Sequence, residues 1–496
     1  MNKHPNIILI LTDQQQARAC RREGFPLDTT PSQDRLASEG IWFDKAYTAA
    51  PICLPARVSL MTGRYPSAHH CQTNQQYDFR ATDNLPEILR RGGYATARVG
   101  KNHSHLGPAN FDHCFDLSHS GGEAHNETEA AFDTWLDALR HGVAMEPPPF
   151  PIEATPPARA VTEACRWMDT VGDRPFFVWL SIPEPHNPYY VPEPYFSLFD
   201  PATLPPVIAN AEQGAAKGYP YRFLQELEHL GMPDIDQRMN RYRANYYGML
   251  RLIDDQIARL IEFLESRKLR EDTLIVYVSD HGDYVGDYGL MRKGAGASES
   301  LMRIPFICNG AGVNRQGRSD AHVSLVDVLP TLCEAAGQPL PVDVQGRSLW
   351  PVLRGEAYSK AEFASVLAEQ GFGGRRWTAE DGYDSRKHVA ESTIHFNELN
   401  PVAQSGNARI LRSGHWKLVV HETGESELYN LTDDPAELEN RFDDPRHAAQ
   451  RAELVLELAR RLVQFQPANP NPWKDVPLRL PAHNWYREAV STSMRS

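Results

Sequence analysis

The chain has few cysteines, and they form no recognisable pairs. Its 496 residues include only seven cysteines, an odd number at scattered positions, and no two stand in a CxxC spacing. A disulfide framework or a zinc ribbon would need paired, regularly spaced cysteines. The sequence therefore supports neither, and the placement of a single cysteine needs a separate explanation.

Long apolar runs are also missing. No stretch of about 20 apolar residues occurs, so the sequence predicts no membrane span and no membrane partner. The N-terminal segment "MNKHPNIILILTDQQ" holds only a short apolar run that stops at Asp13. This run is too short for the apolar region of a signal peptide, and no cleavage site follows it. We therefore expect a cytoplasmic protein.

The chain has fewer basic than acidic residues, 51 lysines and arginines against 64 aspartates and glutamates. The formal net charge is −13, which argues against a nucleic-acid partner because such proteins need a basic face. The overall field would also repel an anionic substrate. Any anion site must therefore be built locally from lysine, arginine, histidine or a metal ion.

Three apolar runs predict buried parallel strands, at Asn6–Thr12, Phe176–Ile182 and Thr273–Ser279. Helical patterns lie between them, including a long one near Gln237–Lys268 whose apolar stripe indicates packing. Strands that alternate with helices are typical of an α/β fold. We expect a large, mixed but mostly parallel sheet sandwiched by helices.

The pattern changes after about residue 370. Residues 408–431 predict antiparallel strands, and a helix follows near residues 447–464, which together indicate a smaller C-terminal α+β subdomain. We predict a catalytic domain at 1–370, this subdomain at 371–466 and an extended tail at 467–496. The tail is rich in proline and aromatic residues, so it either contacts a second subunit in a homo-oligomer or folds back on its own chain.

Polar residues follow each predicted strand. Asp13 and Gln14 follow the first strand, His186 comes shortly after the second, and Asp280 and His281 follow the third. Ligands in open α/β sheets bind beyond the carboxyl ends of the strands, so these residues should meet in space. Mostly oxygen ligands favour Ca²⁺, with Mg²⁺ or Mn²⁺ as alternatives. The competing interpretation is that each aspartate caps a turn.

Cys53 opens the segment "CLPARVSLM", which predicts a helix with Pro55 in its first turn. A helix N-terminus favours anions, and Arg57 lies one turn further on. A bare cysteine there would be a reactive thiolate of low pKa. The alternative is an inert, buried cysteine, the commonest fate of a lone one.

Six motifs in order give the chain a family resemblance: "TPSQDRLASEG", "CLPAR…MTG", "GYATARVGKNHSHLG", "PHNPY", "SDHGD" and "MRKGAGASESLMRIPFI". With the C-terminal "HWKLVV…ELYNLTDDPAELEN", they resemble the type I sulfatases of the alkaline phosphatase superfamily over roughly residues 4–465. Each motif alone is weakly specific, whereas the ordered set is highly specific.

The resemblance implies a sulfatase in which Cys53 is converted to formylglycine by a formylglycine-generating enzyme. It implies a metal held by Asp13, Gln14, Asp280, His281 and residue 53. Arg57 and Lys101 would steady the formylglycine oxygens, and His103 would act as the base. His186 and Lys293 would hold the sulfate and protonate the leaving oxygen.

Two departures leave alternatives open. Gln14 and His281 replace residues that many sulfatases have as Asp and Asn, a pattern shared with choline sulfatases and with formylglycine-dependent phosphonate monoester hydrolases. The latter generally lack the pair Lys101 and His103, so we favour a sulfatase, with phosphonate or phosphate diester hydrolysis as the alternative. An unconverted Cys53 would leave a metal-dependent binder of sulfated ligands.

The substrate is less well defined. A cytoplasmic sulfatase would meet small imported molecules, and we favour a small carbohydrate sulfate over an aryl sulfate or choline sulfate. Candidate substrate-binding residues are His105, Arg303, Trp377 and His395. Aromatic residues such as Tyr189 and Tyr190 would alternatively form a cage for a quaternary amine.

Overall fold

Three buried parallel strands form the centre of a nine-stranded sheet. The computed structural model describes residues 4–75, 79, 83–341, 343–389 and 395–464. β1 (Asn6–Thr12) pairs in parallel with β6 (Phe176–Ile182) and β7 (Thr273–Ser279). These are the three strands predicted from the sequence, with the same bounds. The other strands of this sheet are β2 (Ile41–Tyr47), β3 (Ala95–Gly100), β4 (His113–Ser118), β5 (Gly121–Gly122), β8 (Phe306–Gly310) and β9 (Gly317–Ser324).

The sheet is mixed but mostly parallel, as predicted. Its strand order is β5-β4-β3-β6-β1-β7-β8-β2-β9. β8 runs antiparallel to both neighbours, β7 and β2, and β5 runs antiparallel to β4. The remaining pairs are parallel.

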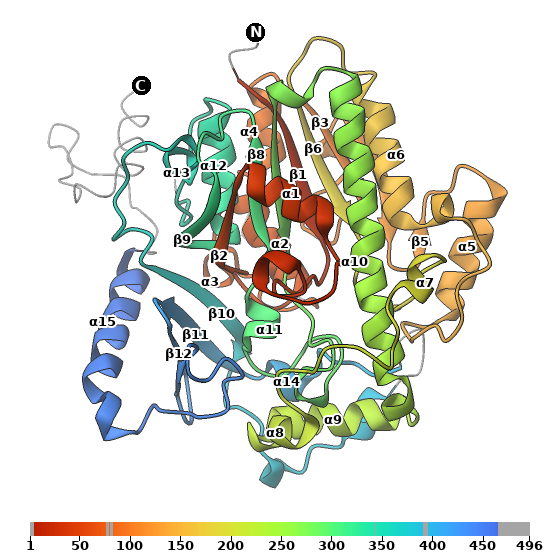
Figure 1. The fold of residues 1–496 in the computed structure, drawn as a ribbon. Coiled ribbons are helices and arrows are strands. Elements are labelled where there is room, and N and C mark those ends of the chain that lie inside the picture. The colour runs from red at the N-terminus through yellow and green to blue at the C-terminus, as the bar shows by residue number, and fades with distance from the viewer. Residues whose placement is uncertain (1–3, 76–78, 80–82, 342, 390–394, 465–496) are drawn as a thin grey trace, which may run out of the picture.

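Helices cover both faces of the sheet (Figure 1). The α-helices of the described residues are α1 (Pro31–Glu39), α2 (Cys53–Thr62), α3 (Pro66–His69), α4 (Leu85–Arg91), α5 (Glu127–Ala138), α6 (Pro156–Met168), α7 (Tyr195–Leu198), α8 (Ala211–Ala216), α9 (Tyr219–Gly231), α10 (Ile235–Ser266), α11 (Glu299–Met302), α12 (Val328–Ala335), α13 (Trp350–Arg354), α14 (Pro401–Gln404) and α15 (Ala448–Gln464). Among the described residues, no helix combines the length and apolar character that a membrane span requires.

The alternation of side chains along β1 explains the two helical layers. Ile7, Leu9 and Leu11 join a core with residues of α2, α4 and α12. Ile8 and Ile10 face the opposite way and join a core with residues of α1, α6 and α10. A strand buried on both faces needs an unbroken apolar sequence, which β1 has.

A second, antiparallel sheet lies in the C-terminal region, as predicted. Its strands are β10 (Ser365–Gly373), β11 (Gly406–Ser413), β12 (Trp416–His421) and β13 (Glu427–Asn430), in that order. α15 packs on one face through Leu454 and Leu458, and Tyr47 and Met302 pack on the other. The predicted domain boundaries stay predictions, and the predicted tail at 467–496 lies outside the described residues.

The register of the central strands sets the position of the polar residues that follow them. Thr12, the last residue of β1, lies opposite Ile182 of β6 and Ser279 of β7. Asp13 and Asp280 therefore leave the sheet at the same edge, and His186 follows four residues after Ile182. The carboxyl-terminal edge of the sheet is thus where chemistry-bearing side chains gather.

Candidate active site

Cys53 is the first residue of α2, where backbone N–H groups have no partner within the helix. Ile52 precedes it with extended backbone (φ −144°, ψ 136°), and Pro55 stands in the first turn, where proline is tolerated. Gly63 ends the helix with a φ of 65°, a conformation that favours glycine. All ten residues of α2 are buried. The helix therefore holds residue 53 at its electropositive end and away from bulk water.

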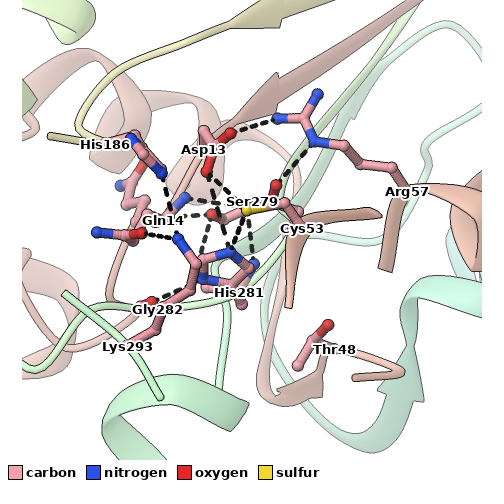
Figure 2. Close-up of polar contacts among 12 residues, drawn as sticks. Asp13, Gln14, Thr48, Cys53, Arg57, His186, Ser279, His281, Gly282 and Lys293 are labelled. Atoms are coloured by element: carbon pink, nitrogen blue, oxygen red, sulfur yellow. Dashed lines mark hydrogen bonds and ion pairs between the residues drawn. The ribbon is translucent and has the colours of Figure 1, made fainter. Parts of the chain in front are cut away.

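The sulfur of Cys53 lies among residues from four other segments of the chain (Figure 2). It is 3.0 Å from Nε2 of His281 and 3.7 Å from Oδ1 of Asp13. The imidazoles of His103 and His186 also interact with this sulfur. In a converted chain, the formylglycine oxygens would replace this sulfur and meet the same neighbours.

Arg57 joins the two strand-end carboxylates. Its Nε donates to Asp280 at 2.8 Å and its Nη2 donates to Asp13 at 3.0 Å, and all three side chains are fully buried. Its Nη1 donates to the hydroxyl of Ser181 at 2.8 Å and to the carbonyl of Lys101 at 3.1 Å. The planar guanidinium is thus fixed by four partners in a geometry that lysine could not reproduce.

Four groups form a possible metal site. Asp13, Cys53, Asp280 and His281 each offer a ligand atom, and these atoms lie within 4.8 Å of one another. The Nδ1–H of His281 donates to the carbonyl of Gly282 at 2.8 Å, so Nε2 faces the site. A backbone acceptor of this kind commonly fixes the tautomer of a metal-binding histidine. The donor set therefore fits a divalent cation.

Gln14 is held beside this group in a strained conformation. Its φ is 74°, unusual for a residue other than glycine, and its backbone N–H donates to Asp280 at 3.0 Å. Its amide nitrogen donates to Asp283 at 2.6 Å, so its amide oxygen is free to accept from Lys293, at 2.6 Å. The amide oxygen thus lies on the site side, where it can complete an oxygen-rich ligand set.

Asp283 is a neighbour of this site that the sequence analysis did not select. Besides Gln14, the hydroxyls of Tyr189 and Tyr242 donate to its carboxylate. Tyr242 belongs to α10, whose apolar stripe predicted only packing. Asp283 lies two residues beyond His281, so its position after the strand could have indicated from the sequence that it lies near the site. Its contacts with Tyr189 and Tyr242 join distant segments, and no pattern in the sequence indicated them.

The site concentrates positive charge around residue 53. Lys101 forms an ion pair with Asp13, and Lys293 lies 3.2 Å from Nε2 of His186. The Nδ1–H of His186 donates to the carbonyl of Asn187 at 2.7 Å. The Nε2 atom of His186 therefore accepts the hydrogen bond from the amine of Lys293. The amine of Lys293 is therefore the proton donor of this pair.

The pKa values reflect this field. Burial alone raises the pKa of the Cys53 thiol, but Lys293, His281 and Lys101 outweigh burial and lower it well below its usual value. Burial and Cys53 likewise raise the pKa of Asp13, but Lys101, His186 and Arg57 lower it below its usual range. Burial and the charge of Asp13 raise the pKa of Asp280. A bound cation would relieve this repulsion between the carboxylates.

Two further histidines, which the sequence analysis did not select, extend the site. His119 stacks on His186 with ring centroids 4.4 Å apart, and His141 lies edge-on to His119 at 4.8 Å. Burial lowers the pKa of His141 to about 3 and that of His186 to about 4, with nearby positive charge acting in the same direction. Neutral imidazoles therefore form a cluster beside His186. His119 follows the end of β4, a strand that no long apolar run marked.

The four predicted substrate-binding residues have different immediate partners in the structure, and their role stays a prediction. His105 is half-buried against Phe79, and desolvation lowers its pKa to about 4. Arg303 pairs with Glu23 at 2.8 Å. Trp377 packs on Tyr383, and the ring of His395 lies beside Gly142. Of these, His395 approaches the histidine cluster, since Gly142 adjoins His141.

Comparison with known proteins agrees with this geometry. A protein-family model described as "Sulfatase" matches residues 5–338. The chain is 26% identical to "Uncharacterized sulfatase YidJ" of Escherichia coli, over 91% of this chain and 86% of that protein. It is 24% identical to "N-acetylglucosamine-6-O-sulfatase" of Bacteroides thetaiotaomicron, over 95% and 88% of the two chains. It is similar in structure to the phosphonate monoester hydrolase of Agrobacterium radiobacter, with a TM-score of 0.76, 24% identity and coverage of 93% and 96%.

Proposed function

The chain belongs to the sulfatase family of sulfuric ester hydrolases, and we propose that it hydrolyses a sulfate monoester of a small carbohydrate. We further propose a formylglycine at position 53 and one divalent cation, Ca²⁺ before Mg²⁺ or Mn²⁺. The observation that carries this proposal is that residue 53 is buried beside the carboxylates of Asp13 and Asp280. Three cationic side chains lie in the same place: Arg57, Lys101 and Lys293. That arrangement can hold an anionic ester in a chain whose net charge is strongly negative.

Both groups that the family implies fit the residues present. When bound, the cation would polarise a sulfate oxygen and lower the pKa of a neighbouring hydroxyl. Asp13, Gln14, Asp280, His281 and residue 53 would hold it. When formed, formylglycine hydrate would supply one hydroxyl as nucleophile and a second one that allows release of sulfate. A formylglycine-generating enzyme is then a required partner.

The residues around position 53 have separable roles. Arg57 and Lys101 orient the oxygens of residue 53, since both are already fixed by Asp13. His103, which interacts with the Cys53 sulfur and has a φ of 35°, is placed to accept a proton from a hydroxyl at that position.

Lys293 and His186 serve the leaving group. The ammonium of Lys293 donates to Oε1 of Gln14 and to Nε2 of His186, so it already directs protons into the site. A sulfate ester in place would offer its bridging oxygen to the same ammonium. His186 then keeps the lysine oriented, and the neutral rings of His119 and His141 border the alcohol that departs.

Support for a carbohydrate substrate comes from the relatives. N-acetylglucosamine-6-O-sulfatase and "Delta 4,5-hexuronate-2-O-sulfatase" of Bacteroides thetaiotaomicron both carry sugar names. The cytoplasmic location, predicted from the sequence alone, would restrict the substrate to small imported molecules. The alternative of a quaternary-amine cage receives no support from Tyr189 and Tyr190, because both rings are buried and their hydroxyls donate to Asp283 and Glu184.

Phosphonate monoester or phosphodiester hydrolysis is the second candidate. It is favoured by Gln14 and His281 at the strand ends. It is also favoured by 26% identity to "Multifunctional alkaline phosphatase superfamily protein PehA" of Trinickia caryophylli. The pair Lys101 and His103 favours sulfate esters, because both side chains lie at the site, against Asp13 and Cys53.

Peptide mass spectrometry across residue 53 tests the proposal, on protein made with a formylglycine-generating enzyme. The same preparation is assayed on an aryl sulfate and an aryl phosphonate, with Cys53→Ala as the control. We expect the aldehyde and a preference for the sulfate ester that Cys53→Ala abolishes. A larger kcat/KM on the phosphonate would establish the second candidate. An unmodified thiol with full activity would contradict the mechanism.

A further inference from the structure

A second cavity, lined by arginines, lies between the catalytic domain and the C-terminal sheet. Its volume is about 360 Å³. Its walls come from the segment after β1, from β2, from α11 and from β11. The residues that contact Cys53 do not line it. This volume falls in the range of about 300–1,000 Å³ that is typical of small-molecule sites, and it exceeds what a single oxoanion fills.

The cavity carries an excess of positive charge. Six cationic side chains line it: Arg18, Arg22, Lys45, Arg303, Arg318 and Arg412. Only three carboxylates do so, those of Glu23, Asp44 and Glu299. Two of these cations are already paired with carboxylates outside the cavity lining, Arg18 with Asp287 at 2.5 Å and Arg22 with Asp34 at 2.6 Å. The excess therefore rests on Lys45 and Arg412, in a chain whose net charge is −13.

The three carboxylates are already engaged. Glu23 accepts from Arg303 at 2.8 Å, and Asp44 pairs with Arg318. Glu299 accepts from Lys417 at 3.0 Å and from the hydroxyl of Tyr47 at 2.6 Å. Glu23 and Asp44 are thus each occupied by one arginine of the cavity, and Glu299 is occupied by Lys417.

Two donor atoms of Arg412 lack a hydrogen-bonding partner within the described part of the chain. Its Nε and Nη1 are buried and form no hydrogen bond with any residue that the structure describes. On the same strand, Arg409 pairs with Glu369 at 3.4 Å, so an arginine on β11 can find a carboxylate within the chain. Buried guanidinium donors are costly when unpaired, and an oxoanion would satisfy both atoms at once.

We propose that this cavity, the arginine pocket, binds a small organic polyanion that carries at least two sulfate or phosphate groups. Guanidinium forks recognise the oxygens of either group, and the arginines are spread over several elements, so one molecule can bridge them. The side chain of Gln16, in the same wall, donates to the carbonyl of Asp283 at 2.9 Å. The pocket wall is thus continuous with the segment that supports Gln14, and the site is separate from the reacting atoms.

Isothermal titration calorimetry tests the proposal in the Cys53→Ala chain, in which the proposed nucleophile is absent. The probes are a disulfated disaccharide and a hexose 1,6-bisphosphate, with a hexose 6-sulfate as the singly charged comparison. Besides any binding at the catalytic pocket, we expect a binding event that Arg412→Met weakens by about tenfold or more, the loss of a charged hydrogen-bonding partner. Lys293→Met should leave this event unchanged, because it alters only the catalytic pocket. Arg409→Met, on the same strand, is the matched control.

Arg318→Met is a second variant that keeps the test valid if Arg412→Met fails to fold. The Arg318 side chain is 65% exposed, so its loss should weaken binding without unfolding the chain. Binding of only one probe would identify the group as sulfate or phosphate. Absence of binding, or binding that both pocket variants leave unchanged, would overturn the proposal. Since hydrolysis is not the readout, this result is independent of the proposed activity.

Discussion

Replacing Arg57 with methionine gives opposite predicted effects on folding and on metal affinity. The side chain is fully buried between Asp13 and Asp280 and also bonds to Ser181 and to the carbonyl of Lys101. Removing one partner of a buried ion pair costs about 3–5 kcal/mol of folding free energy. We therefore expect Arg57→Met to lower the free energy of unfolding by about 3–5 kcal/mol when metal is absent. Arg57→Lys keeps the charge but loses the fork, and should lose about half as much.

Metal affinity should change in the other direction. At an effective dielectric constant of about 20, two unit charges about 5 Å apart interact by roughly 3 kcal/mol. Without the guanidinium, a divalent cation would meet both carboxylates with less repulsion. We expect Arg57→Met to bind Ca²⁺ at least about tenfold more tightly, a gain of about 1.4 kcal/mol, although it loses activity.

Urea unfolding followed by tryptophan fluorescence, in chelator and in saturating Ca²⁺, measures both effects. Calorimetric titration of Ca²⁺ measures the affinity directly. The Cys53→Ala background removes the thiolate from the comparison. Arg35→Met is the control, because its pair with Glu39 is exposed and should contribute at most about 1 kcal/mol. Equal losses of stability in chelator and Ca²⁺, or weaker Ca²⁺ binding, would refute the assignment of the two carboxylates as metal ligands.

Three further changes test other parts of the structure. Lys293→Met should lower kcat by about 10²–10³-fold with a smaller effect on KM, because one hydrogen-bond donor to the transition state is lost. An unchanged kcat in a stopped assay would show that Lys293 has no catalytic role. Asp283→Asn should weaken Ca²⁺ binding by about 10–100-fold in a calorimetric titration, because Gln14 loses the carboxylate that orients its amide. Glu299 has its pKa lowered to about 2, since Lys417 and Arg412 outweigh its burial. Its contribution to stability is present above about pH 4.5 and is lost as the pH falls toward about 2. Glu299→Gln should therefore flatten the pH dependence of urea unfolding over that interval, and an unaltered slope would contradict it.

The sequence predicted the central strands and their ends well because each of these is a local property. β1, β6 and β7 are uninterrupted apolar runs, and the edge at which parallel strands end follows from topology. The proximity of Asp13 and Asp280 could therefore be predicted from the rule that ligands bind beyond the carboxyl ends of the strands. α2 was predictable for a similar reason, since Pro55 and Gly63 mark its ends.

The contacts that the sequence could not predict join distant segments through side chains. Tyr242 on α10 reaches Asp283 across the site, and a periodic apolar stripe carries no information about a polar tip at one position. His119 joins His186 because β4 lies beside β3 in the sheet, and β4 has no long apolar run to reveal it. Arg412 likewise faces the arginine pocket only because β11 packs against the catalytic domain.

The charges around residue 53 would give a reason for the proposed conversion of Cys53. Arg57, Lys101 and Lys293 supply three positive charges against the two carboxylates of Asp13 and Asp280. A Cys53 thiolate, favoured by the lowered pKa of its thiol, would cancel the remaining positive charge where an anionic ester must approach. A neutral aldehyde hydrate leaves that charge available. The proposed conversion at position 53 would therefore change both the nucleophile and the electrostatic capacity of the pocket to accept a sulfate ester.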